Sequence, residues 1–92
     1  MTGTTTAPTM RAKLQVGFVQ ENFYGPEKAK SSEVLTMHAV CAPKYDPTGL
    51  DEDNTFAKFS PSANLSINIA NPVLWDKFKV GDRFYVDFTP AA

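Results

Sequence analysis

Residues 11–20 read RAKLQVGFVQ, a stretch in which polar and apolar side chains alternate. The apolar members of the alternation are Ala12, Leu14, Val16 and Phe18. The polar members are Arg11, Lys13 and Gln15. Successive side chains of a β-strand point to opposite faces, so the pattern predicts a strand with one buried face. We expect Phe18 to share that buried face with the other apolar residues.

The same alternation recurs further along the chain. It covers residues 33–41, 63–69 and 84–88, and a shorter strand is expected at residues 55–59. Residues 21–32 contain Gly25-Pro26, several charges and paired serines, which indicates a long exposed connection. Pro43 and Pro47 bracket a second loop, since proline cannot donate to a central strand ladder.

A short helix is predicted from Asn71-Pro72. Asparagine caps the free N–H groups of a first helical turn, and proline fits its first position. The helix can continue for about two turns before the glycine at Gly81 leads into the last strand. The chain is therefore predicted to be all-β. We expect five short strands in a small antiparallel barrel or curled sheet, with one short helix before the last strand.

The length of 92 residues suits one small domain and is too short for two hydrophobic cores. Residues 1–9 are rich in threonine and lack apolar periodicity, which predicts a flexible N-terminal arm. Residues 10–92 would form a single barrel-like domain. One cysteine cannot form an internal disulfide, which favours a reducing compartment. We expect no membrane span and no signal peptide, because no apolar run is long enough.

Charge disfavours several classes of partner. Nine Lys and Arg residues against ten Asp and Glu residues give a formal net charge of -1. Such a chain has no cationic field to attract nucleic acid or anionic lipid. Five-stranded barrels can nevertheless bind single strands by stacking bases on aromatic rings in a basic groove. Here the groove would need Phe23, Tyr24, Phe59 and Tyr85 beside Lys28, Lys30, Lys58 and Arg83.

The acidic loop does not predict a metal site. Asp51, Asp53 and Thr55 have the spacing of the first ligands of a calcium loop. Phe56 stands where that loop needs glycine for its sharp turn. We therefore expect a solvated loop that can meet a basic patch on a partner.

Catalysis is not expected either. The only histidine, His38, is three residues from Cys41, and this odd spacing places them on opposite faces of a strand. They cannot share a zinc ion, and no nucleophile motif or phosphate-binding glycine loop is present. We predict that the protein is not an enzyme and has no cofactor.

Three segments resemble those of known proteins. They are LTMHAVC at residues 35–41, DNTFAKFSPS at residues 53–62 and FYVDFTP at residues 84–90. Similar segments occur in small β-rich proteins of tailed phages and prophages, most of them uncharacterised or labelled only as virion-associated. The resemblance covers roughly residues 10–92 and implies a phage origin. It carries no functional residue with it.

We therefore predict a phage structural accessory protein, most simply a capsid decoration or cement protein that stabilises the assembled shell. Its partners would be the major capsid protein or other virion subunits, and further copies of itself in a homo-oligomer. It would be made in the cytoplasm of the bacterial host and end in the virion. Two alternatives stay open. One is an intracellular phage accessory protein, either a single-stranded nucleic-acid binder or an inhibitor of a host enzyme, and the other is a tail or neck subunit.

Partner contacts are expected in the arm, at two neighbouring aromatic residues and in the acidic loop. These residues are Thr4, Thr5, Thr6, Pro8, Phe23, Tyr24, Asp51, Glu52 and Asp53. An uncharged extended arm can thread along a neighbouring subunit, and an acidic loop can meet a basic groove.

Overall fold

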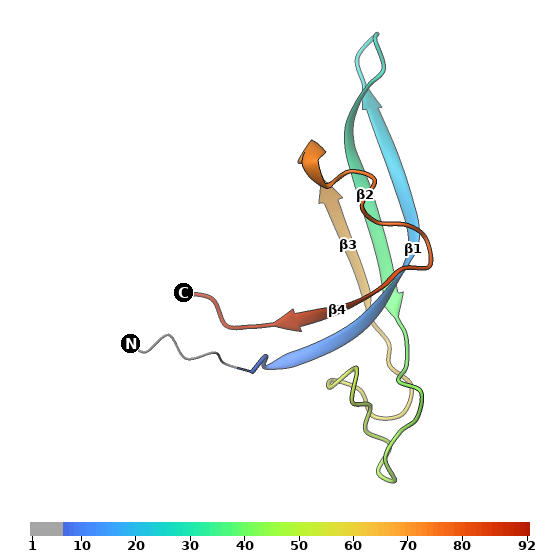
Figure 1. The fold of residues 1–92 in the computed structure, drawn as a ribbon, viewed down its shortest axis with the longest axis vertical. Helices are drawn as coiled ribbons and strands as arrows, with labels where there is room; N and C mark the ends of the chain where they lie inside the picture. Colours follow the sequence, from blue (N-terminus) through green and yellow to red (C-terminus); the bar gives the residue numbers. More distant parts are fainter. Residues whose placement is uncertain (1–6) are drawn as a thin grey trace.

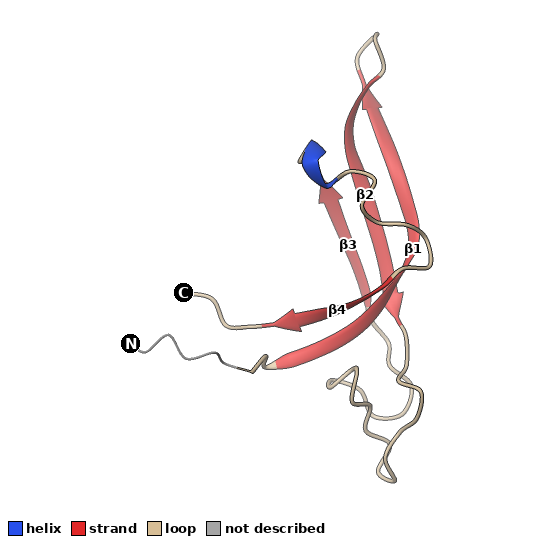
Figure 2. Cartoon of the chain, viewed as in Figure 1, coloured by secondary structure: helices blue, strands red, loops and turns tan. Residues whose placement is uncertain are grey.

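The computed structural model describes residues 7–92, which form one antiparallel sheet of four strands (Figure 1, Figure 2). The strands are β1 (Met10–Tyr24), β2 (Ala29–Ala39), β3 (Asn64–Ile69) and β4 (Arg83–Phe88). A 3-10 turn covers Pro72–Leu74. The protein is mainly β, as the alternation predicts, but the expected count of five strands is wrong.

The strand order is β3-β2-β1-β4, a Greek key in which the last strand returns to lie beside the first. β1 pairs with β4 along its N-terminal part and with β2 along the remainder. Figure 1 shows β1 bending between these two parts, so that β4 runs across the direction of β2 and β3. No pairing joins β3 to β4, so the sheet is open and the predicted barrel is wrong.

One face of the sheet, here called the inner face, carries the core. Its buried apolar residues are Ala12, Leu14, Val16, Leu35, Met37 and Ile69. The segment between β3 and β4 crosses this face, and its residues Trp75 and Phe78 pack against the core. The indole N–H of Trp75 donates to the carbonyl oxygen of Ile69 at 2.8 Å, so this large, partly buried ring has no unpaired donor.

A β-bulge at Gly17 changes which residues of β1 face the core. Val16 and Phe18 stand opposite consecutive residues of β2, so Gly17 has no partner there. One extra residue reverses the alternation that follows it. Phe18 is therefore 55% exposed, on the outer face, while Val19 packs against the core. The prediction that Phe18 shares the buried face is wrong.

The β1–β2 hairpin replaces the long loop predicted for residues 21–32. Only residues 25–28 turn, where Gly25 and Lys28 have φ angles of 79° and 53° and the Lys28 N–H donates to the Gly25 carbonyl oxygen at 3.0 Å. Because β3 ends at Ile69 opposite Glu33, the hairpin continues beyond it as a two-stranded projection (Figure 1). The loop prediction is wrong because the two strands go on pairing almost to the turn.

The strand predicted at residues 55–59 belongs to the loop between β2 and β3. Thr55 donates its N–H to the Arg11 carbonyl oxygen at 2.9 Å. Phe59 has a φ of 63°, which is incompatible with an extended strand, and a single bridge joins Lys58 to Leu50. The expected strand is absent because these residues hold the loop against β1 instead.

The helix predicted to begin at Asn71 is only the 3-10 turn. Asn71 does cap it, since its side-chain oxygen accepts a hydrogen bond from the Val73 N–H at 3.2 Å. The turn stops at Trp75, which has extended backbone angles, and Asp76 has a φ of 63°. The chain must leave the helical path here to carry Trp75 onto the core. Among residues 7–92, no helix is long and apolar enough to cross a membrane.

Candidate interaction surface

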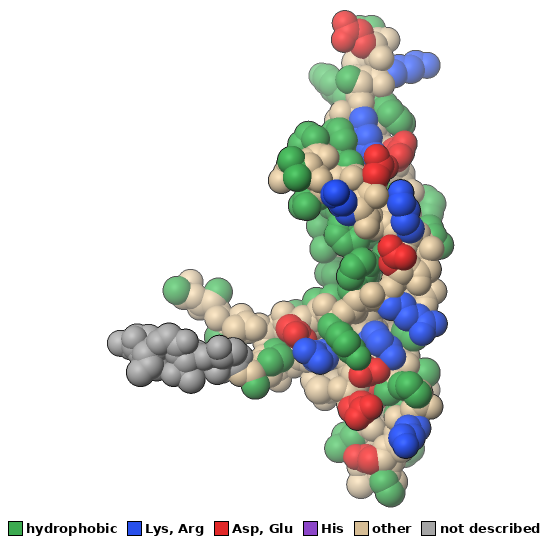
Figure 3. All heavy atoms as spheres, viewed as in Figure 1, with side chains coloured by type: hydrophobic (Ala, Val, Ile, Leu, Met, Phe, Trp, Pro, Cys, Tyr) green, Lys and Arg blue, Asp and Glu red, His purple; other side chains and the backbone are tan. Residues whose placement is uncertain are grey.

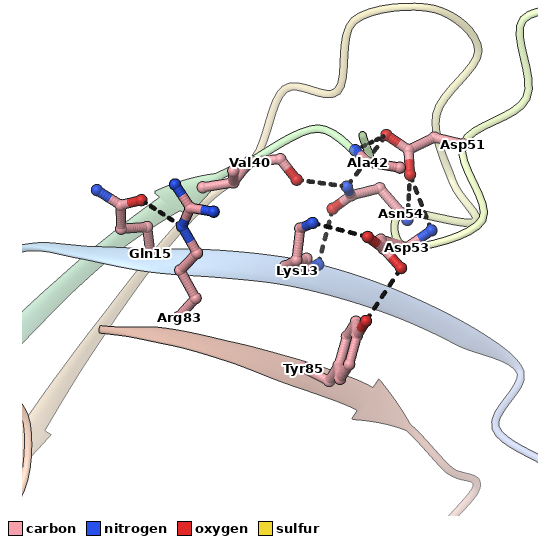
Figure 4. Close-up of polar contacts among 9 residues, drawn as sticks. All are labelled: Lys13, Gln15, Val40, Ala42, Asp51, Asp53, Asn54, Arg83 and Tyr85. Carbon is pink, nitrogen blue, oxygen red and sulfur yellow. Dashed lines mark hydrogen bonds and ion pairs between the residues drawn. The ribbon is translucent and has the colours of Figure 1, made fainter. Parts of the chain in front are cut away.

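Asp51 anchors the loop between β2 and β3 (Figure 4). The residue is 2% exposed, and its carboxylate accepts hydrogen bonds from the backbone N–H groups of Ala42, Asp53 and Asn54 at 3.0, 2.8 and 2.9 Å. Burial by itself would raise the pKa of Asp51, but these hydrogen bonds outweigh burial and lower the pKa below its ordinary value. Asp51 therefore stays charged inside the loop and holds it together.

Asn54 joins the loop to β1 and is fully buried, with 0% of its surface exposed. Its side-chain oxygen accepts from the Lys13 N–H at 2.8 Å, and its side-chain amide donates to the Val40 carbonyl oxygen at 2.8 Å (Figure 4). The same amide donates to Asp51 at 3.3 Å. Since β2 ends at Ala39, the Asn54 side chain bridges the Lys13 N–H of β1 and the Val40 carbonyl oxygen just after β2, two groups that would otherwise lack a partner.

The acidic loop presents little free charge. Asp53 accepts hydrogen bonds from the Lys13 ammonium at 2.7 Å and from the Tyr85 hydroxyl at 3.1 Å (Figure 4). Asp51 is buried, and only Glu52 of the predicted acidic contact residues is exposed without an internal partner among the described residues. The partner-binding role of these three residues stays a prediction. For Asp51 and Asp53, any such role would have to coexist with these internal contacts.

The outer face pairs its own charges. The Arg11 guanidinium donates to Asp87 at 2.6 and 3.0 Å, and it also lies 4.4 Å from the centre of the Tyr85 ring. The hydrogen bonds from Arg11 lower the pKa of Asp87. The Arg83 side chain donates to Gln15 at 2.9 Å. Figure 3 shows Lys and Arg side chains interspersed with Asp and Glu, without a patch of one sign on the face drawn.

The aromatic residues considered for base stacking lie on separate segments. Tyr85 pairs with Lys13 at one end of β1, whereas Phe23 and Tyr24 lie at its other end. Ten residues of extended chain separate Lys13 from Phe23, which is about 33 Å. Phe59 lies in the loop before β3. The structure does not bring these rings and the predicted cations into one groove.

Three carboxylates meet where the hairpin leaves the sheet. Oxygens of Glu21, Glu33 and Asp76 lie within 4.8 Å of one another, a separation that could suit a metal ion. The ammonium of Lys30 already lies among them, at 3.4, 3.3 and 3.9 Å respectively, and 4.9 Å from the centre of the Trp75 ring. Burial alone would lower the pKa of Lys30, but the carboxylates raise it on balance. The cluster is a closed ion-pair network that ties the hairpin to the crossing segment.

His38 and Cys41 do not form a catalytic arrangement with each other. His38 is exposed on β2, and Cys41 is exposed just after that strand ends. Within residues 7–92, no hydroxyl or thiol group is hydrogen-bonded to His38. Desolvation raises the pKa of Tyr45, and the neighbouring Cys41 adds to this effect. The absence of enzymatic activity stays a prediction.

An apolar groove opens on the inner face, between the start of β3 and the paired N-terminal part of β1 and β4. It has a volume of about 240 Å³. Its apolar lining includes Met10, Leu14, Phe56, Leu65, Val86 and Phe88. Figure 3 shows hydrophobic side chains gathered over β3 and the 3-10 turn on the face drawn. A groove of this character buries apolar side chains of another molecule more readily than it holds a polar substrate.

The hairpin tip carries the predicted contact residues Phe23 and Tyr24. They are 56% and 80% exposed, on a projection that extends beyond β3. Pro8 lies just before β1 and is half-buried. Thr4, Thr5 and Thr6 fall outside the described residues. The tip is therefore the part of the predicted contact set that the structure presents as an exposed aromatic surface.

Sequence reasoning missed the buried anchoring role of Asn54, the ion-pair role of Lys30 and the groove. The Asp51-x-x-Asn54 spacing is a usable signal for the first, because Asp and Asn side chains often bond to backbone groups two or three residues away. Lys30 has no such signal, because its partners come from three separate segments. The groove depends on the sheet staying open, which alternation alone does not reveal.

Comparisons of the chain with protein families, with curated proteins and with solved structures found no match. The resemblance to phage proteins therefore stays a prediction that rests on the three sequence segments alone.

Proposed function

We propose that the chain is a structural accessory subunit of a tailed-phage virion, and that it decorates and stabilises the assembled capsid shell. Two independent lines support this. The sequence segments resemble phage proteins, and the described surface exposes large apolar and aromatic side chains of the kind that contact other proteins.

The observation that carries the proposal is the excess of exposed surface. The chain has an accessible surface of 6700 Å², whereas a compact monomer of 10.1 kDa would have about 5300 Å². Its radius of gyration is 16.7 Å, against roughly 12 Å for a compact chain of this length. The molecule is only 16 Å thick along its shortest axis. A sheet this thin leaves apolar side chains in water unless another protein covers them.

Binding to the assembled shell would stabilise it by mass action. A subunit that binds only the assembled lattice stabilises it by RT ln(1 + [L]/Kd) at each site, about 2.7 kcal/mol at 100 times Kd. Symmetry repeats this contribution over many sites. Phe23 and Tyr24 are the proposed shell contacts, because exposed aromatic side chains commonly anchor protein interfaces.

The test begins with purified virions of the phage or prophage that encodes the chain. Mass spectrometry is expected to find the protein in many copies per particle, and its deletion is expected to make filled capsids release DNA at a lower temperature. Absence from virions would refute the proposal, as would capsids equally resistant to heat after deletion. Recovery only in tail fractions would replace it with a tail or neck subunit.

A binding assay then addresses the contact residues. Purified protein is added back to virions that lack it, and the bound copies are counted. The double variant Phe23→Ser, Tyr24→Ser is expected to bind at least tenfold more weakly, while Glu27→Ser, an exposed change in the same hairpin, serves as the matched control. Equal binding by all three proteins would exclude the hairpin tip as the contact.

A further inference from the structure

The outward edge of β3 is unpaired. The Ala39 N–H donates to the Ala63 carbonyl oxygen at 3.0 Å, and this pair continues the β2–β3 register. In an antiparallel ladder, every second residue turns its amide and carbonyl groups to the same neighbour. The groups that face away from β2 are therefore those of Asn64, Ser66 and Asn68. All three residues are exposed and have no other hydrogen-bond partner among the described segments.

This edge has none of the usual protection. Natural sheets guard free edges with charged side chains, proline or bulges. β3 reads NLSINI and contains no charge and no proline, and its pairing with β2 has no register shift. The other free edges are β4, which carries Arg83 and Asp87, and the part of β1 beyond β4, residues 18–24, which carries Glu21. The β3 edge is thus the free edge best suited to pair with another strand.

We propose that this edge binds the β3 strand of a second copy, antiparallel, across a two-fold axis at Ser66. Ser66 would then face its own counterpart, and Asn64 would face Asn68 of the other copy. On the inner face, Leu65 would lie opposite Ile67 of the other copy. Polar residues meet polar ones, apolar residues meet apolar ones, and no like charges oppose each other. The strand is therefore complementary to itself.

The ends of β3 add a second complementarity. Val73 and Leu74, 73% and 44% exposed, lie in the 3-10 turn that follows the end of β3. The apolar groove, with Phe56 and Leu65, lies at its start. An antiparallel arrangement brings the end of one β3 to the start of the other. Val73 and Leu74 of each copy would then cover the apolar groove of the other copy, so the two-fold axis produces this contact twice.

This pairing accounts for much of the exposed apolar surface beside β3 and leaves the Phe23 and Tyr24 tip free. Backbone pairing alone would hold two strands weakly, since an isolated pair of strands is marginal in water. The reciprocal covering of the grooves supplies the apolar centre that a stable interface needs. The inference concerns the isolated chain and is independent of the proposed role in a virion.

The first test measures mass in solution. Sedimentation equilibrium of the full chain at micromolar concentration is expected to give about twice 10.1 kDa. Ser66→Lys places a charge against its own counterpart at the axis and is expected to give the monomer mass, with an unchanged circular dichroism spectrum. Gln20→Lys adds the same charge at an exposed position of the outer face, away from the edge, and should remain dimeric.

The second test locates the axis. Residues directly opposite in such a pair have Cα atoms about 5.5 Å apart, within disulfide range. In a Cys41→Ser background, Ser66→Cys is expected to cross-link to the dimer on mild oxidation, at least tenfold faster than Gln20→Cys. A monomeric wild-type chain, a dimer unaffected by Ser66→Lys, or equal cross-linking rates would each overturn the inference. A monomer that still binds virions would overturn it while leaving the proposed function intact.

Discussion

Replacing Asn54 by alanine should weaken the fold more than any exposed change in the same loop. The substitution leaves the Lys13 N–H and the Val40 carbonyl without their partners, which now lie at 2.8 Å in each case. An unsatisfied buried polar group costs about 1–3 kcal/mol. Both bonds are part-buried, so entering water recovers some of this cost, and we expect the free energy of unfolding to fall by about 2–4 kcal/mol.

The measurement is urea unfolding followed by fluorescence of the single tryptophan, Trp75, and in parallel by circular dichroism. Asn54→Asp provides a sharper second variant. It keeps an acceptor for Lys13, loses the donor to Val40 and puts a negative charge beside Asp51, so it should be more destabilising at pH 7 than at pH 4. Glu52→Ala is the matched control and should stay within about 0.5 kcal/mol of wild type. An Asn54→Ala protein as stable as that control would refute the anchoring role.

Three further predictions concern charge, register and backbone strain. Because hydrogen bonds lower the pKa of Asp51 in the folded state, its contribution to stability is present above the ordinary pKa of 3.8 and is lost as pH falls through the lower folded value. The urea midpoints of wild type and Asp51→Asn should therefore differ at neutral pH and converge below that value; a constant gap would contradict this. Val19→Ala should cost about 1–2 kcal/mol and Phe18→Ala less than about 0.5, because the bulge turns only Val19 inward; the reverse order of unfolding midpoints would contradict the register. Gly49→Ala should cost about 1–3 kcal/mol, since Gly49 has a φ of 87° and a Cβ there would lie 2.7 Å from an aromatic ring atom. Gly81 also has a positive φ, 98°, but a Cβ there would meet no atom within 4 Å. Gly81→Ala should therefore lower the stability measured by thermal unfolding less than Gly49→Ala does.

The strands could be predicted from the sequence because each has one face that meets water. Along β4, Phe84, Val86 and Phe88 alternate with polar residues, and the structure pairs this strand with β1 throughout. The same reasoning failed at Gly17. A glycine inside an alternating stretch is compatible with both a regular strand and a bulge. Only the register of the neighbouring strand distinguishes them, and it is a long-range property.

The candidate site was predictable only where local sequence controls it. Phe23 and Tyr24 could be named as exposed because they adjoin a Gly-Pro turn. The acidic loop was identified by its charge, but its internal role depends on Lys13, a residue roughly forty positions earlier in the chain. The net charge of the loop counts all of its carboxylates as if they were in water. Which of them remain free depends on how the folded loop packs against β1.

The pairing of Met10 with Phe88 joins the two ends of the described sheet. The bent strand β1 thus meets a local partner through one half and the last strand of the chain through the other. Contacts between such distant positions form late, because a large loop must close before any contact energy is gained. The hairpin of β1 and β2 can form early, whereas the N-terminal half of β1 stays unpaired until β4 is available. A chain interrupted before residue 83 would leave that half exposed to other unfinished chains, so aggregation during synthesis should depend on how soon the C-terminal strand arrives.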